Sequence, residues 1–186
     1  MVTKIAPLLT VADLDLTPDD GNRYELIDGE LFVSCAPGIP HQRIVHNLQM
    51  ALGTYLARNP IGLLVPGPGV IFSDMSGVIP DVVFVSQARQ PEVAAGERVT
   101  GAPDLVIEVL SPGTENARRD REVKRQLYGR YGVPEYWIVA PEQRAVEVYR
   151  QHQGSLELIG TFMDHDHVTS PLFPDFRLRV LDIFEL

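Results

Sequence analysis

Polar and apolar residues alternate along much of this chain in short runs that predict strands, and two longer stretches have the spacing of amphipathic helices. Residues 23–34 alternate on both sides of Asp28-Gly29, a dipeptide typical of a two-residue hairpin turn. Residues 41–58 repeat apolar side chains at helical spacing, so we expect a long helix that begins just after Pro40. An antiparallel hairpin is therefore expected to precede a helix, after an irregular lead-in with a short helical turn near residues 10–16.

The remainder of the chain predicts a sheet and a second helix. That helix is expected over residues 115–131, because Gly132 stands where a C-terminal cap belongs and Pro134 prevents continuation. The expected strands are a two-stranded unit in residues 70–86, single strands at 102–110, 134–141 and 144–151, and further strands with a last docked segment in 156–186. This order predicts an α/β fold, a mixed β-sheet flanked by helices, with an added N-terminal hairpin and C-terminal strands.

Length and composition place the chain among folded globular proteins. It has 186 residues, of which 45% are apolar and 22% are charged, so we expect one domain over residues 1–186. The single cysteine cannot form an internal disulfide, and the N-terminal residues lack the apolar run of a signal peptide. No stretch of about 18 apolar residues occurs, so no membrane span is expected and the cytoplasm is the expected location.

The chain is acidic as a whole but contains one local cluster of basic residues. A net charge of −9 argues against coating nucleic acid by bulk electrostatics. The second predicted helix nevertheless holds six of the sixteen basic residues, and this helix could meet a polyanion. Interleaved acids such as Asp120 and Glu122 favour the other interpretation, a solvated helix with local ion pairs.

Candidate chemistry begins with two stretches that open on Pro-Asp and run into apolar residues, at 79–86 and 102–111. In the second stretch, strand alternation places Glu108 on one face with Val106 and Leu110, so a carboxylate interrupts a buried face. Asp81 starts the first strand. If the two strands pair, Asp81 and Glu108 converge on one cation, and hard oxygen ligands suit Mg²⁺ or Mn²⁺. The alternatives are a turn role for Asp81 and a buried arginine partner for Glu108.

Three further residues complete the candidate site. Lys124 lies on the inward stripe of the second helix, where it could stabilise developing negative charge or extend to solvent. Glu25 lies on the hairpin and could complete the acidic cluster, although an ion pair with Arg23 or another surface base explains it equally well. His41 opens the long helix and could contact a scissile phosphate or a water, or simply finish a loop. Asp104 of the second Pro-Asp pair is interpreted as structural.

Pro80 and Asp81, followed one strand later by Glu108, resemble the signature of the PD-(D/E)xK nuclease superfamily, whose fold is restriction-endonuclease-like. Over nearly the whole chain, the order of several segments also resembles the Uma-two family of small bacterial proteins. These segments are YELIDGEL, PDVVFV, PDLVIEVLSPGT, GVPEYWIVAP and SPLFPDFRLRVLDIF. The resemblance implies a restriction-endonuclease-like core and a metal-dependent phosphodiesterase acting on DNA, with Asp81 and Glu108 as Mg²⁺ ligands. The superfamily expects a lysine where this chain has Leu110, and Lys124 is expected to replace it.

We therefore predict a Mg²⁺- or Mn²⁺-dependent endonuclease with DNA as substrate, in which Asp81, Glu108 and Lys124 are catalytic and Glu25 and His41 are auxiliary. The competing hypothesis is a catalytically inactive module of the same fold that binds nucleic acid or protein. A third hypothesis, an acid-pair hydrolase on another substrate, predicts activity that survives EDTA. The sequence leaves open whether the chain forms a homodimer that would place two sites on opposite DNA strands.

Overall fold

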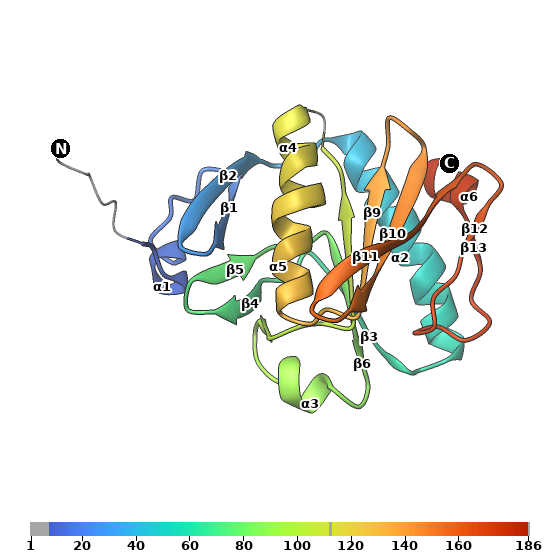
Figure 1. Cartoon of the computed structure of the whole chain (residues 1–186), viewed down its shortest axis with the longest axis horizontal. Coiled ribbons are helices and arrows are strands. Elements are labelled where there is room, and N and C mark those ends of the chain that lie inside the picture. Colours follow the sequence, from blue (N-terminus) through green and yellow to red (C-terminus); the bar gives the residue numbers. More distant parts are fainter. Residues whose placement is uncertain (1–7, 112, 186) are drawn as a thin grey trace.

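A computed structural model describes residues 8–111 and 113–185, which contain a six-stranded sheet and a five-stranded sheet. The six-stranded sheet has the order β11-β10-β9-β8-β6-β3, in which only β8 and β9 are parallel. Its strands are β3 (Gly62–Pro66), β6 (Val82–Ser86), β8 (Leu105–Val109), β9 (Glu135–Ala140), β10 (Ala145–His152) and β11 (Ser155–Met163). The predicted mixed sheet is therefore confirmed (Figure 1).

A second sheet of five strands carries the predicted hairpin. Its order is β2-β1-β5-β4-β7, and the pairing of β1 with β2 turns at Asp28-Gly29 as expected. Its strands are β1 (Asn22–Ile27), β2 (Glu30–Cys35), β4 (Val70–Ser73), β5 (Ser76–Val78) and β7 (Val99–Thr100). Near the C-terminus, β12 (His167–Val168) and β13 (Leu178–Arg179) form a short two-stranded sheet.

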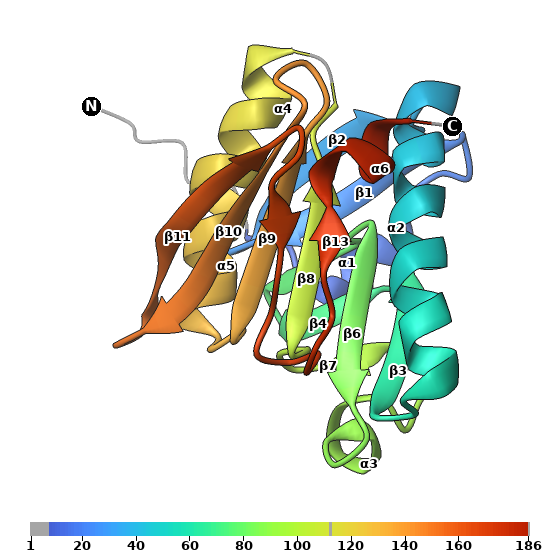
Figure 2. The same ribbon diagram turned by 90° about the vertical axis from the view of Figure 1, so that its right-hand side faces the viewer.

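Helices cover both faces of the six-stranded sheet (Figure 2). Helix α2 (Ile39–Arg58) packs on one face through Ile44, Val45, Leu48 and Leu52. The other face is covered by a continuous helical stretch made of α4 (Thr114–Arg118), a π-helical segment (Arg119–Lys124) and α5 (Arg125–Arg130). The remaining short helices are α1 (Val11–Leu14), α3 (Gln90–Val93) and α6 (Val180–Phe184). Among the described residues, no helix has the length and apolar character needed to cross a membrane.

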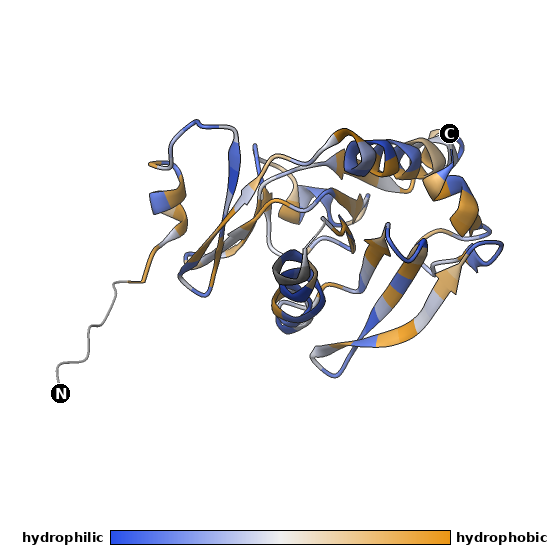
Figure 3. Ribbon diagram, turned by 90° about the horizontal axis from the view of Figure 1, so that it is seen from above, coloured by the Kyte–Doolittle hydropathy of each residue, from blue (hydrophilic) through white to orange (hydrophobic). Residues whose placement is uncertain are grey.

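Strand alternation places the side chains of β8 as the sequence predicts. Leu105, Ile107 and Val109 join the core on the α2 side, whereas Val106 and Leu110 join the core beneath α5. Glu108 shares the second face and is buried. Strand β11 lies at the edge of the sheet and is mostly exposed, whereas its neighbour β10 is buried over much of its length. Hydrophilic and hydrophobic residues follow one another in bands along the strands and helices (Figure 3).

Two expectations about the elements were wrong, and one feature was not foreseen. Helix α2 begins at Ile39, not after Pro40, because proline is tolerated in a first helical turn, where its missing N–H would be unpaired anyway. Residues 70–86 form three strands in two sheets, not one two-stranded unit. Pro80 lacks an N–H and interrupts pairing, so the chain leaves β5 of one sheet and starts β6 in the other. The second helix contains a π-helical segment that no sequence pattern indicated.

Candidate active site

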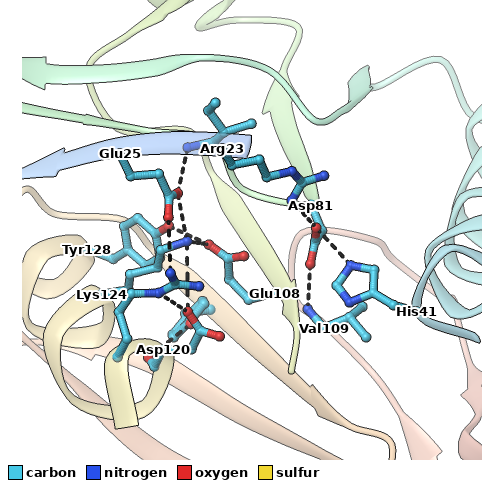
Figure 4. A network of polar contacts seen from close by, with 12 residues as sticks. Arg23, Glu25, His41, Asp81, Glu108, Val109, Asp120, Lys124 and Tyr128 are labelled. Carbon is cyan, nitrogen blue, oxygen red and sulfur yellow. Dashed lines mark hydrogen bonds and ion pairs between the residues drawn. The ribbon is translucent and has the colours of Figure 1, made fainter. Parts of the chain in front are cut away.

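Five elements converge on one cavity of about 400 Å³ at the junction of the two sheets. All five candidate residues line it: Glu25, His41, Asp81, Glu108 and Lys124. They come from β1, the first turn of α2, the residue before β6, β8 and the π-helical segment (Figure 4). We call this space the site cavity. The fold thus brings together residues that are up to 99 positions apart in the sequence, from Glu25 to Lys124.

Asp81 is tied directly to the strand that carries Glu108. Its Oδ2 accepts a hydrogen bond of 2.8 Å from the N–H of Val109, which follows Glu108 on β8. Its Oδ1 lies 3.0 Å from Nη1 of Arg23 and 3.1 Å from Nε2 of His41. Burial raises the pKa of Asp81, but His41, the Val109 N–H and Arg23 outweigh burial, so the pKa lies below its ordinary value. Asp81 is therefore a carboxylate at neutral pH.

Glu108 and Lys124 form a second, deeper group in the site cavity. Nζ of Lys124 lies 2.9 Å from Oε1 of Glu108 and 2.8 Å from Oε1 of Glu25. The Tyr128 hydroxyl donates a hydrogen bond of 2.8 Å to the same Glu108 oxygen. Burial raises the pKa of Glu108 to about 8, and the neighbouring carboxylates support this rise while Lys124 opposes it.

Lys124 remains positively charged although it is 2% exposed. Burial alone would lower its pKa, but the carboxylates of Glu108, Glu25 and Asp120 raise the pKa above its ordinary value. Oδ1 of Asp120 lies 3.8 Å from Nζ of Lys124, and both residues belong to the π-helical segment. π-helical turns are rare and occur often at functional sites. This segment directs Asp120 and Lys124 into the cavity together.

Sequence reasoning missed several residues that hold the candidate acids in place. Arg23, offered only as one alternative partner for Glu25, contacts Asp81. Glu25 contacts Lys124 and accepts a 2.8 Å hydrogen bond from the N–H of Ile79. Tyr128 and Asp120 were also missed as site residues. The inward stripe of the second helix could have identified them, because both lie on it beside Lys124.

The donor set suits a hard divalent cation, although the acids occur as two groups. Mg²⁺ is usually bound by one or two carboxylates together with waters and substrate phosphates. Asp81 and Glu108 supply two carboxyl groups in one cavity, so their chemistry fits Mg²⁺ or Mn²⁺. Over the described ranges, no group of three or more His, Cys, Asp or Glu side chains is arranged to hold a metal ion. A cation here would thus depend on water and phosphate for its other ligands.

Comparisons with known proteins agree with this architecture. A solved structure from Anabaena variabilis, described as "a putative nuclease belonging to DUF820", superimposes with a TM-score of 0.76 at 22% sequence identity. The alignment covers 95% of this chain and 97% of that one, which establishes a common fold. No similar sequence was found among curated proteins. The model of the Uma2 family, described as "Putative restriction endonuclease", matches residues 11–181. Because this match spans most of the chain, the protein belongs to the Uma2 family.

Proposed function

We propose that this protein is a metal-dependent nuclease that hydrolyses DNA phosphodiester bonds at the site cavity. The observation that carries the proposal is the joint placement of Asp81 and Glu108, each 4% exposed, with Lys124 2.9 Å from Glu108. Burying three such charged or titratable groups is costly, and stability alone does not require it. Functional sites are where such arrangements with shifted pKa values concentrate.

The side chains have distinct roles in this proposal. Asp81 and Glu108 would hold Mg²⁺ or Mn²⁺, and the bound ion supplies an activated water and neutralises phosphate charge. Lys124 replaces the lysine that the superfamily has at the position of Leu110. Its ammonium contacts Glu108 and can stabilise developing negative charge. Leu110 is 6% exposed within the apolar core beneath α5. Arg23 and Arg119 border the same cavity and add positive charge that favours a phosphate.

The test is incubation of purified protein with supercoiled plasmid and either Mg²⁺ or Mn²⁺. The proposal expects nicked or linear plasmid, and it expects EDTA to abolish cleavage. Cleavage that survives EDTA would indicate the acid-pair hydrolase instead. In parallel, calorimetry should detect Mn²⁺ binding that is lost in Asp81→Ala and in Glu108→Ala. Absence of both cleavage and Mn²⁺ binding would contradict the proposal.

A non-catalytic module that binds nucleic acid or protein is the second candidate function, and one observation favours it. The acids of the site cavity are already paired with protein cations, Asp81 with Arg23, and Glu25 and Glu108 with Lys124, and His41 also contacts Asp81. A metal ion must compete with these contacts. The module predicts that a labelled DNA or protein partner binds without metal and that no plasmid is cut under any metal condition.

Metal binding should depend on pH through Glu108. A carboxyl group must be ionised to ligate a metal, and the pKa of Glu108 is about 8. Below that pH a proton must leave when the ion binds, so the Kd for Mn²⁺ should rise about tenfold for each pH unit below about pH 8. Calorimetry in buffers of different ionisation enthalpy measures the proton release directly. A Kd that does not change with pH would show that Glu108 is not a ligand.

A further inference from the structure

The N-terminus of α2 opens into the site cavity without a capping side chain. Gly38 is the N-cap residue, and it provides no side-chain hydrogen bond to the free N–H groups of the first turn. Gly38 and His41 both line the site cavity. Space does not explain this glycine, because an added Cβ would have only Cδ of Pro40 nearby, at 3.7 Å. The helix dipole of this 20-residue helix therefore points its positive end at the cavity with donors available.

His41 gives a second, independent indication of a ligand at the same place. Its side chain is 8% exposed and reaches from α2 toward Asp81 and Val109 (Figure 4). Both ring nitrogens are buried and neither makes a hydrogen bond of good geometry among the residues that the structure describes; Nε2 lies 3.1 Å from Oδ1 of Asp81, whereas no contact is formed at Nδ1. Buried polar atoms in native proteins are nearly always paired. A ligand in the cavity would supply the missing partner.

A second hollow lies on the other side of His41. It has a volume of about 430 Å³ and is lined by Pro40, Leu110 and Arg121, among others. His41 and Ser111 border both this hollow and the site cavity. A ligand bound at His41 therefore has space on two sides. This arrangement suits one monomer within a polymeric ligand.

We infer that the N-terminus of α2 and His41 form a second phosphate position, next to the phosphate that reacts at Asp81 and Glu108. Free N–H groups at a helix start bind phosphate oxygens. An imidazole that is protonated on both nitrogens can donate from Nδ1 to a phosphate while Nε2 donates to Asp81. The inference rests on the proposed nuclease function and deepens it. The substrate is a polynucleotide strand that is held through two neighbouring phosphates, with a nucleotide in each hollow.

The test introduces a charge at the N-cap. Gly38→Asp caps the helix, so the melting temperature should stay unchanged or rise, while its carboxylate repels a phosphate. Gly38→Ala is the matched control, because it adds neither a cap nor a charge. The probe is a fluorescein-labelled strand of thymidines, and its binding is followed by fluorescence anisotropy in EDTA at low salt. We expect the Kd to rise at least about tenfold in Gly38→Asp and in His41→Leu, and to stay within about twofold in Gly38→Ala. His41→Asn, which keeps a side-chain donor, should recover part of the loss.

These outcomes separate the inference from the proposed function. If the protein cuts plasmid with Mn²⁺ but Gly38→Asp binds the strand as the wild type does, the second phosphate position alone is overturned. The same holds if the wild-type protein cuts plasmid but does not bind the strand. Strand binding that falls in Gly38→Asp, in a protein that neither binds Mn²⁺ nor cuts plasmid, would support the phosphate position and overturn the nuclease. If His41→Leu does not fold, Gly38→Asp and Gly38→Ala decide the question.

Discussion

Replacing Lys124 with methionine is expected to lower the free energy of unfolding by about 3 to 5 kcal/mol, because it leaves the buried Glu25 carboxylate, whose pKa is held below its ordinary value, without its counter-charge. Methionine fills a similar volume, so the loss reports charge and not a cavity. Lys124 is the common partner of Glu25 and Glu108, and the nearest other cation, Arg119, lies 3.9 Å from Glu25. Urea unfolding measures the change through the transition midpoint at constant slope.

Arg98→Met is the matched control for this prediction. Arg98 forms an ion pair of 2.8 Å with Asp15, as short as that of Lys124 with Glu25. The Arg98 and Asp15 side chains are 48% and 62% exposed, however, whereas Lys124 and Glu25 are buried. An exposed pair contributes at most about 1 kcal/mol, so this variant should unfold near the wild-type midpoint. The loss in the free energy of unfolding caused by Lys124→Met should also become smaller toward pH 5, because protonated carboxyl groups need no counter-charge. Equal effects of the two substitutions would show that the acids around Lys124 are not ionised in the folded protein.

The parts of the fold that depend on local sequence could be predicted. Asp28-Gly29 determines a turn by its backbone preference alone, and the apolar spacing of α2 follows from helix geometry. Alternation along β8 likewise identified Glu108 as a buried carboxylate before its surroundings were known. A buried acid in a strand is informative because it must have partners, even when the sequence does not show which ones.

The partners themselves depend on contacts between distant segments, and these could not be predicted. An ion pair between Arg23 and Glu25, which share one face of β1, was one alternative that the sequence allowed, but Arg23 contacts Asp81, 58 residues away. The division of residues 70–86 between two sheets brings Asp81 against the N–H of Val109. The π-helical segment changes which side chains share a helix face, and helical periodicity at 3.6 residues per turn does not describe it.

Asp81→Asn is expected to reduce plasmid cleavage about a thousandfold. A bound metal contributes several kcal/mol to a phosphoryl-transfer barrier, about 4 kcal/mol corresponds to three orders of magnitude, and the substitution removes one ionised ligand. Glu108→Gln should give a loss of the same order for the same reason. The measurement is the initial rate of plasmid nicking at saturating Mn²⁺, with the melting temperature recorded for each variant.

Asp104→Asn separates this effect from a loss of structure. Asp104 follows a proline as Asp81 does, accepts a 2.8 Å hydrogen bond from the N–H of Ser86, and contacts Arg89 at 3.3 Å. It does not line the site cavity. The two Pro-Asp carboxylates therefore make the same kinds of contact in different places, so their asparagine variants should lose similar stability. Only Asp81→Asn should lose cleavage. If both variants cut plasmid at the wild-type rate, Asp81 would be a structural residue like Asp104, and the repeated Pro-Asp pattern would reflect how two strands begin and not where the chemistry lies.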